Sequence, residues 1–335
     1  MKVKLLIATV DTRFSTHISN NISEHHANTI DVSVCNTLEC LQEALSKRKY
    51  DVALLDSSLI EHADTKSIHL PLFLWSENDA AFEVPTGYER IQKYRRISVT
   101  VATVLERFAK VSKDRHESDS DTAKITTIWS PAGGTGKTTI ALAYSMFKAN
   151  YKKEVFYLNL EPFSSIPAYF NENGRSISAV FELLDSHEGN VKMLIQGVSC
   201  CENGIFFLNR PDNYDDMCIL SSDNTVELIT SCAQLADELV IDLSNSCDER
   251  TRKVFELSDN LLIVTDPAAS AEIKLKQFIS QNNVFESIKD KVILIANKGT
   301  LVNQSPVESV ISFPYIQSND AIGVYKALSE IGFSC

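Results

Sequence analysis

Short apolar stretches alternate with amphipathic ones along the whole chain. Stretches rich in β-branched and aromatic residues predict strands, and stretches with leucine and alanine at helical spacing predict helices. In the first part of the chain the predicted strands are 4–10, 30–34, 51–55, 70–75 and 89–92, and the predicted helices are 37–48 and 99–108. Strands that alternate with helices favour a parallel sheet covered on both faces.

The same alternation resumes at Lys124. Predicted strands there are 124–129, 154–160, 204–208, 238–242, 260–264, 291–296 and 307–312, and predicted helices are 140–144, 176–184, 190–195 and 223–235. Between the two halves, residues 111–122 are charged, rich in serine and nearly free of apolar side chains, which is typical of an exposed linker. The sequence therefore predicts two doubly wound α/β domains, 1–110 and 123–335, the second with a mostly parallel sheet.

Composition narrows the choice of function. The 335 residues are enough for two domains, and a net charge of −12 argues against broad nucleic-acid binding, which needs a positive field. None of the eight cysteines forms a Cys-x-x-Cys pair or a zinc pattern, so we expect reduced thiols. The N-terminus resembles a first strand more than a signal peptide, and no apolar run reaches the ~20 residues of a membrane span. We expect a cytoplasmic protein.

The most specific motif is the glycine-rich turn 130–139, Ser-Pro-Ala-Gly-Gly-Thr-Gly-Lys-Thr-Thr, between a predicted strand and a predicted helix. Glycines let backbone N–H groups approach phosphates, and the helix N-terminus favours their negative charge. Lys137 would reach the β- and γ-phosphates, and the Thr138 hydroxyl would bind Mg²⁺. Pro131 stands where glycine is usual, so the match is to a variant form. The predicted nucleotide-binding residues are Gly133, Gly134, Thr135, Gly136, Lys137, Thr138 and Thr139.

Two acidic residues follow predicted strands of the second domain. Glu161 comes after Asn159 at the end of one strand, where it would orient water or hold a metal-bound water. It could also simply close the strand with Pro162. Asp242 ends a short apolar strand, as expected of the aspartate that holds Mg²⁺ in phosphate-binding α/β domains. Together with Thr138, Asp242 is the predicted metal site.

Two further features suit a nucleotide base. Asn297 and Lys298 end another apolar strand, and an amide at this position suits the edge of a purine. Pro314, between two aromatic residues, could supply surface on which the base stacks, although it could equally mark a turn.

Polar side chains also follow the strands of the first domain. Asp11, Asp56, Ser76 and Lys93 come after its first, third, fourth and fifth predicted strands. In an open parallel sheet these positions share one edge, where sites usually form. The arrangement resembles a response-regulator receiver domain of flavodoxin-like fold, with Asp56 as phosphate acceptor, Asp11 as metal ligand, and Ser76 and Lys93 as the hydroxyl and the lysine. Thr12 replaces a common second acid and Tyr94 a common proline, so a degenerate docking or dimerisation module is the favoured reading.

The second domain resembles the ParA/MinD group of deviant P-loop ATPases. The resemblance lies in 132–139, in Asn159-Leu160-Glu161-Pro162, in Asp242 and in Asn297-Lys298. With the receiver-like domain in front, the whole chain looks like the CpaE/TadZ branch of pilus-assembly proteins. The resemblance implies ATP and Mg²⁺ as cofactors, with Lys137 and Glu161 in catalytic roles.

The departures from this group concern catalysis. Ala132 occupies the position of the signature lysine that reaches the phosphates of the partner subunit, and Glu161 replaces an aspartate. Losing a cation near the γ-phosphate removes transition-state stabilisation worth several kcal/mol. We therefore expect ATP to bind but to be hydrolysed slowly.

The favoured function is an ATP-dependent localisation factor that forms a homodimer and recruits or positions pilus-assembly or type II-like secretion proteins, at the cell pole or membrane periphery through those partners. A partition ATPase that binds DNA, and a response regulator with an ATPase output domain, are the alternatives. We expect no nucleic-acid partner. Direct membrane insertion is not expected either, because Lys326 is the only basic residue of 320–335.

Overall fold

The computed structural model describes residues 2–27, 29–79, 82–84, 87–112, 123–171, 175–187, 189–299, 307, 309–318 and 320–333. The chain divides into two compact units, Met1–Asp114 with Glu188–Gly197, and Arg115–His187 with Val198–Cys335. Most of the predicted linker 111–122 lies outside the described residues. No helix of the described residues is long and apolar enough to cross a membrane.

The first unit contains a five-stranded parallel sheet with strand order β2-β1-β3-β4-β5, which is the flavodoxin-like order. Its strands are β1 (Val3–Ala8), β2 (Ile30–Cys35), β3 (Tyr50–Leu55), β4 (Ile68–Trp75) and β5 (Glu89–Gln92), and its helices are α1 (Thr12–His25), α2 (Leu38–Lys47), α3 (Ile97–Val111) and α6 (Val191–Val198). The doubly wound α/β class predicted from the sequence is confirmed.

Both faces of this sheet are covered, because its strands carry buried side chains on both sides. Ile18 of α1 and Leu105 of α3 pack on one face, and Leu41 of α2 packs on the other. The described residues between β3 and β4 form no α-helix and contain the 3₁₀ turns Ile60–His62 and Thr65–Ser67.

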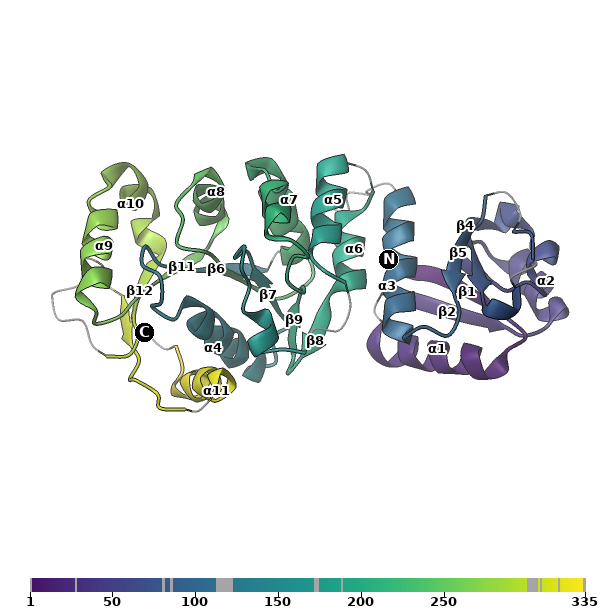
Figure 1. Cartoon of the computed structure of the whole chain (residues 1–335), viewed down its shortest axis with the longest axis horizontal. Coiled ribbons are helices and arrows are strands. Elements are labelled where there is room, and N and C mark those ends of the chain that lie inside the picture. The colour runs from purple at the N-terminus through teal and green to yellow at the C-terminus, as the bar shows by residue number, and fades with distance from the viewer. Residues whose placement is uncertain are drawn as a thin grey trace. The chain divides into compact units, whose positions relative to one another are not determined.

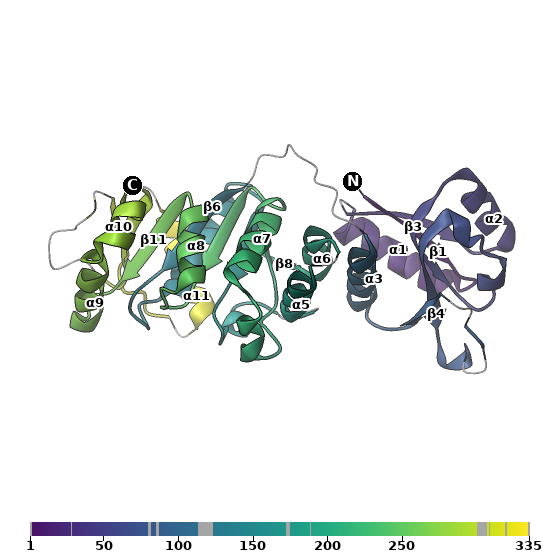
Figure 2. The ribbon, with the colours of Figure 1, turned by 90° about the horizontal axis from the view of Figure 1, so that it is seen from above.

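Helix α6 corrects the predicted domain boundary. The sequence assigned all of 123–335 to the second domain, yet residues 188–197 group with the first unit. Figures 1 and 2 both show α6 beside α3. The Asn190 N–H donates to the Ala109 carbonyl at 2.7 Å, and a Cβ at Gly197 would lie 2.6 Å from Leu105 Cβ. Only glycine at 197 permits this close approach, so α6 completes the packing around α3.

Replacing Gly197 by valine is expected to lower the stability of the first unit by about 2 kcal/mol, because the new side chain overlaps Leu105. Hydrogen exchange of peptides from α3 and α6, followed by mass spectrometry, would report the loss of protection. Lys192→Val, at a half-buried position of the same helix, is the control and should leave the exchange of α3 nearly unchanged. Equal exchange in both variants would contradict the packing described here.

The described residues of the second unit contain an eight-stranded sheet, β13-β12-β11-β6-β10-β7-β9-β8, in which β8 and β9 pair antiparallel and the other neighbouring strands pair parallel. Its strands are β6 (Lys124–Trp129), β7 (Val155–Asn159), β8 (Cys200–Glu202), β9 (Ile205–Phe207), β10 (Glu238–Asp242), β11 (Asn260–Thr265), β12 (Val292–Ala296) and β13 (Val310–Ser312). The predicted mostly parallel sheet is therefore confirmed.

Helices cover both faces of this sheet. They are α4 (Lys137–Asn150), α5 (Ser178–Ser186), α7 (Ser222–Ala233), α8 (Glu249–Leu257), α9 (Ala269–Ile279), α10 (Asn282–Ile288) and α11 (Ala321–Ile331). Figure 1 shows α4 and α11 on one side of the strands and α7 and α8 on the other. Successive residues of β6 point to opposite faces of the sheet. Ile128 packs in the core with residues of α4, and Trp129 packs against Phe255 of α8. The N-cap of α7 is Ser221, whose side chain accepts from the Asn224 N–H.

Candidate functional site

The glycine-rich turn lies between β6 and α4, as predicted (Figure 1). Gly136 has a φ of +92°, which only glycine adopts without strain, and α4 begins at the next residue. A Cβ on Gly136 would also lie 2.4 Å from Nδ2 of Asn297. The turn thus delivers Lys137, Thr138 and Thr139 to the first turn of a helix, whose N–H groups have no partners within the helix and favour an anion.

Two side chains that follow β12 donate hydrogen bonds to backbone carbonyls of this turn. Asn297 Nδ2 donates to the Thr135 carbonyl at 2.8 Å, and Lys298 Nζ donates to the Gly134 carbonyl at 3.0 Å. Lys298 also lies 3.7 Å from the Asp266 carboxylate. The structure therefore brings both predicted residues to the turn, where they hold its backbone. Base recognition by Asn297 stays a prediction.

Lys137 is buried between acidic groups rather than free in solvent. Its Nζ lies 3.5 Å from Oε1 of Glu161, and only 9% of its side chain is exposed. Asp242, on the neighbouring strand β10, is completely buried. The structure thus collects Lys137, Thr138, Glu161 and Asp242 into one cluster beneath the turn, as the sequence predicted for a phosphate and metal site.

The two oxygens of Asp242 have different surroundings. Oδ2 accepts hydrogen bonds from the Tyr157 hydroxyl at 2.9 Å and from Asn159 Nδ2 at 3.1 Å. Oδ1 is buried and accepts no hydrogen bond from any residue that the structure describes. A buried carboxylate oxygen without a donor is costly, so this oxygen is available to a cation.

Burial raises the pKa of Asp242 to about 7, and the charge of Glu161 acts in the same direction. The hydroxyls of Thr138 and Tyr157 and the ammonium group of Lys137 oppose the rise. Burial also raises the pKa of Tyr157 well above its ordinary value, which keeps the hydroxyl protonated and able to donate.

The residues around Asp242 fit Mg²⁺. This cation prefers oxygen ligands and binds through one or two carboxylates together with phosphate oxygens. Asp242 Oδ1, which has no hydrogen-bond donor among the described residues, could supply a carboxylate oxygen, and Thr138, whose hydroxyl lowers the pKa of Asp242, could supply a second oxygen.

The segment after β13 contributes less than expected. Phe313 is buried and packs against Phe333 with ring centroids 4.9 Å apart, so it belongs to the core and not to a base-stacking surface. Pro314 and Tyr315 are exposed. Stacking of a base on Pro314 stays a prediction.

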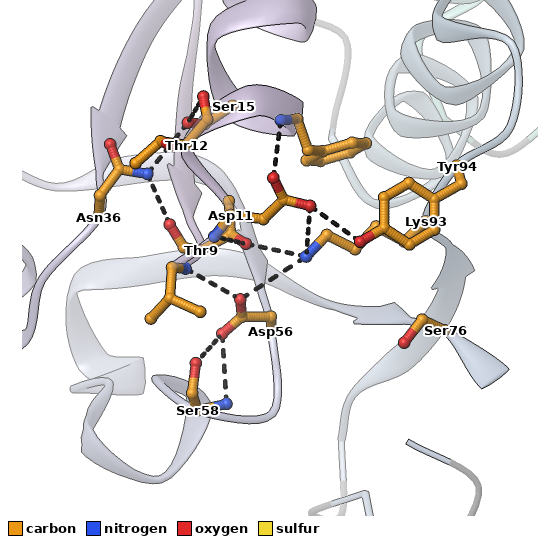
Figure 3. A network of polar contacts seen from close by, with 12 residues as sticks. Thr9, Asp11, Thr12, Ser15, Asn36, Asp56, Ser58, Ser76, Lys93 and Tyr94 are labelled. Atoms are coloured by element: carbon orange, nitrogen blue, oxygen red, sulfur yellow. Dashed lines mark hydrogen bonds and ion pairs between the residues drawn. The ribbon is translucent and has the colours of Figure 1, made fainter. Parts of the chain in front are cut away.

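In the first unit, three of the four predicted polar residues meet at one sheet edge (Figure 3). Lys93 Nζ lies 3.6 Å from Asp11 and 3.9 Å from Asp56, and it donates to the Thr9 hydroxyl at 3.1 Å. The Phe14 N–H lowers the pKa of Asp11, and the Tyr94 hydroxyl, at 2.8 Å, adds to this effect. The ammonium group of Lys93 therefore offsets part of the negative charge of the two carboxylates.

Ser76 is separate from this cluster, contrary to the prediction. Its hydroxyl and its N–H both donate to Oδ2 of Asp79, at 2.6 and 2.9 Å, and Figure 3 shows no contact between Ser76 and Asp56. The nearby aspartate on the turn after β4 draws the hydroxyl away. The sequence could not show this competition.

Both oxygens of Asp56 are already engaged. Oδ1 accepts from the Ser58 hydroxyl at 2.6 Å and from the Ser58 N–H at 3.2 Å, while Oδ2 accepts from the Val10 N–H at 3.1 Å and faces Lys93. With Thr12 in place of a second acid, we expect no phosphate transfer to Asp56.

Incubation of the protein with acetyl phosphate and Mg²⁺ is expected to leave its intact mass unchanged, because Asp56 is buried and a second metal-binding acid is lacking. Asp56→Ala is the control for adducts elsewhere on the chain. An added phosphate in the natural protein that is absent from Asp56→Ala would contradict this expectation and favour the response-regulator alternative.

Sequence reasoning missed several members of these sites, namely Thr9, Ser58, Asp79, Tyr157 and Asp266. The position of Tyr157 in the sequence could have indicated that it belongs to the site. Residues two apart on a strand share a face, so Tyr157 had to point the same way as Asn159.

Neither a protein-family model nor a curated protein matches this chain. Among solved structures, a ParA family ATPase from Chlorobium tepidum is similar over 64% of this chain and 93% of its own, with 17% identity and a TM-score of 0.51. The chain has a ParA-type ATPase fold over that length. The structure is also similar to the cell division ATPase MinD of Pyrococcus furiosus, with 14% identity over 62% of this chain and 97% of that chain and a TM-score of 0.48. A third similar structure is MinD of Pyrococcus horikoshii with Mg-ADP, with 14% identity over 62% of this chain and 95% of that chain and a TM-score of 0.46.

Proposed function

We propose that this protein is an ATP-binding assembly switch that dimerises with bound nucleotide and positions a protein apparatus. The observation that carries the proposal is the cluster beneath the glycine-rich turn. A buried lysine at the start of α4 lies 3.5 Å from the Glu161 carboxylate, and Asp242 of the same cluster has a buried carboxylate oxygen with no hydrogen-bond donor among the described residues. That combination suits a triphosphate accompanied by Mg²⁺.

Each residue of the cluster has a defined task. The N–H groups of the turn and the first turn of α4 would bind the β-phosphate, and Lys137 would bind the β- and γ-phosphates after exchanging Glu161 for them. Thr138 and Asp242 would hold Mg²⁺, which neutralises phosphate charge. Glu161, released from Lys137, would orient water near the γ-phosphate. Asn297 and Lys298 keep the turn in its binding shape.

Hydrolysis should be slow. Ala132 offers only a methyl group at the position where related ATPases carry a lysine, and it is buried with its N–H bonded to the Ser130 hydroxyl. The expected role of ATP is therefore to hold the protein in an assembled state rather than to drive rapid turnover.

The finer identity proposed is a CpaE/TadZ-like factor in pilus assembly or type II-like secretion. A flavodoxin-like unit ahead of a ParA-type fold supports it. The cluster of Asp11, Asp56 and Lys93, in which both oxygens of Asp56 already have partners, supports a docking or dimerisation role for that unit.

Titration of the protein with ATP in a calorimeter tests the binding proposal. We expect binding with Mg²⁺ and weaker binding in EDTA. Lys148→Ala, which changes a lysine of the same helix that bonds Glu238 at 2.8 Å, should bind ATP as the natural protein does. Absence of ATP binding in the natural protein would contradict the proposal.

A further inference from the structure

Tyr157 and Asn159 form a pair of donors aimed at Asp242. They lie two residues apart on β7, so their side chains point to the same side of the strand. Strand β7 pairs with β10 so that Asn159 lies opposite Asp242. The tyrosine hydroxyl and the Asn159 amide both donate to Oδ2 of Asp242, and the amide also donates to the hydroxyl at 3.0 Å.

Both donors converge on Oδ2, while Oδ1 accepts no hydrogen bond among the residues that the structure describes. A carboxylate accepts equally well on either oxygen, so donors placed on Oδ2 alone fix the rotation of the group. The hydroxyl is fully buried, and burying it has a cost that phenylalanine would avoid. A hydroxyl at this position is explained by its bond to Asp242.

We propose that Tyr157, together with Asn159, is a positioning residue that reserves Asp242 Oδ1 for the cation that accompanies the bound nucleotide. The inference rests on the proposed function. Partners that orient metal-binding side chains typically contribute 10- to 100-fold to metal affinity, so removal of the hydroxyl should weaken Mg²⁺ binding and leave contacts to the nucleotide intact.

The experiment measures ATP binding to the full-length protein by calorimetry in EDTA and over a series of Mg²⁺ concentrations. In Tyr157→Phe we expect the Mg²⁺ concentration that gives half of the affinity gain to rise about tenfold, with ATP affinity in EDTA unchanged. The matched control is Tyr144→Phe, which removes another buried tyrosine hydroxyl of the same unit, 3.3 Å from the Thr126 hydroxyl. The control should match the natural protein.

An unchanged Mg²⁺ midpoint in Tyr157→Phe, or an equal shift in both variants, would overturn the positioning role and leave the proposed function standing. No ATP binding by the natural protein would overturn both. If Tyr157→Phe does not fold, Asn159→Ala removes the second donor, and a midpoint equal to that of the natural protein would then overturn the inference.

Discussion

Replacing Lys137 by alanine is expected to weaken ATP binding about a hundredfold or more. The lysine is the cation held at the start of α4 beneath the turn, and charge-assisted hydrogen bonds to phosphate oxygens contribute about 1.5–3 kcal/mol each. Two such bonds correspond to about two orders of magnitude or more in affinity. Calorimetry with Mg²⁺ and ATP measures the effect directly.

Lys148→Ala is again the matched control, because it removes a lysine three turns further along α4. ATP affinity in Lys137→Ala within a few-fold of the natural protein would place the phosphates elsewhere and contradict the assignment of the turn.

Replacing Asp242 by asparagine is expected to abolish the gain in ATP affinity that Mg²⁺ gives, while stabilising the nucleotide-free protein. The amide oxygen of asparagine can still accept the hydrogen bonds from Tyr157 and Asn159, but the side chain lacks the negative charge that binds a cation. The stabilisation follows from burial, which raises the pKa of Asp242 to about 7 in the folded protein, against about 3.9 in an unfolded chain.

The direction in which stability changes with pH follows from the protons bound to Asp242 in the folded and unfolded states. Between about pH 4 and pH 7 the folded state holds a proton on Asp242 that the unfolded state has lost, so this group makes stability fall as pH rises through that window, with no further fall above it. At pH 8 the asparagine variant should be more stable by about 2 kcal/mol, below the limit set by the full pKa difference. At pH 4 the difference should vanish. Urea unfolding at both pH values measures it, and an Asp242→Asn variant less stable at pH 8 would contradict the account.

The core of the nucleotide site could be predicted because its signals are local. Glycine at 136, followed by Lys137 and Thr138, fixes the start of a helix within a few residues, and Asp242 closes an apolar strand. Glu161 lies beside Lys137 because the parallel strands of one sheet end at the same edge, here with β10 between β6 and β7.

The rest depends on contacts between distant segments. Helix α1 packs on the sheet through only a narrow apolar stripe of Phe14, Ile18 and Ile22. Because the residues around this stripe are mainly polar, the sequence pattern does not predict a helix there. Ser76 was placed in the first unit's cluster by the end of its strand, but Asp79 captures its hydroxyl. Helix α6 was predicted as an element, yet nothing in its own sequence shows that it packs against α3.

Light scattering gives the solution mass of the protein without nucleotide, with ADP, and with ATP and Mg²⁺, and so shows directly whether nucleotide controls assembly. We expect a mass that doubles only with ATP and Mg²⁺, and no doubling for Lys137→Ala. A mass that is the same in all three conditions would contradict an assembly switch and leave ATP as at most a structural ligand.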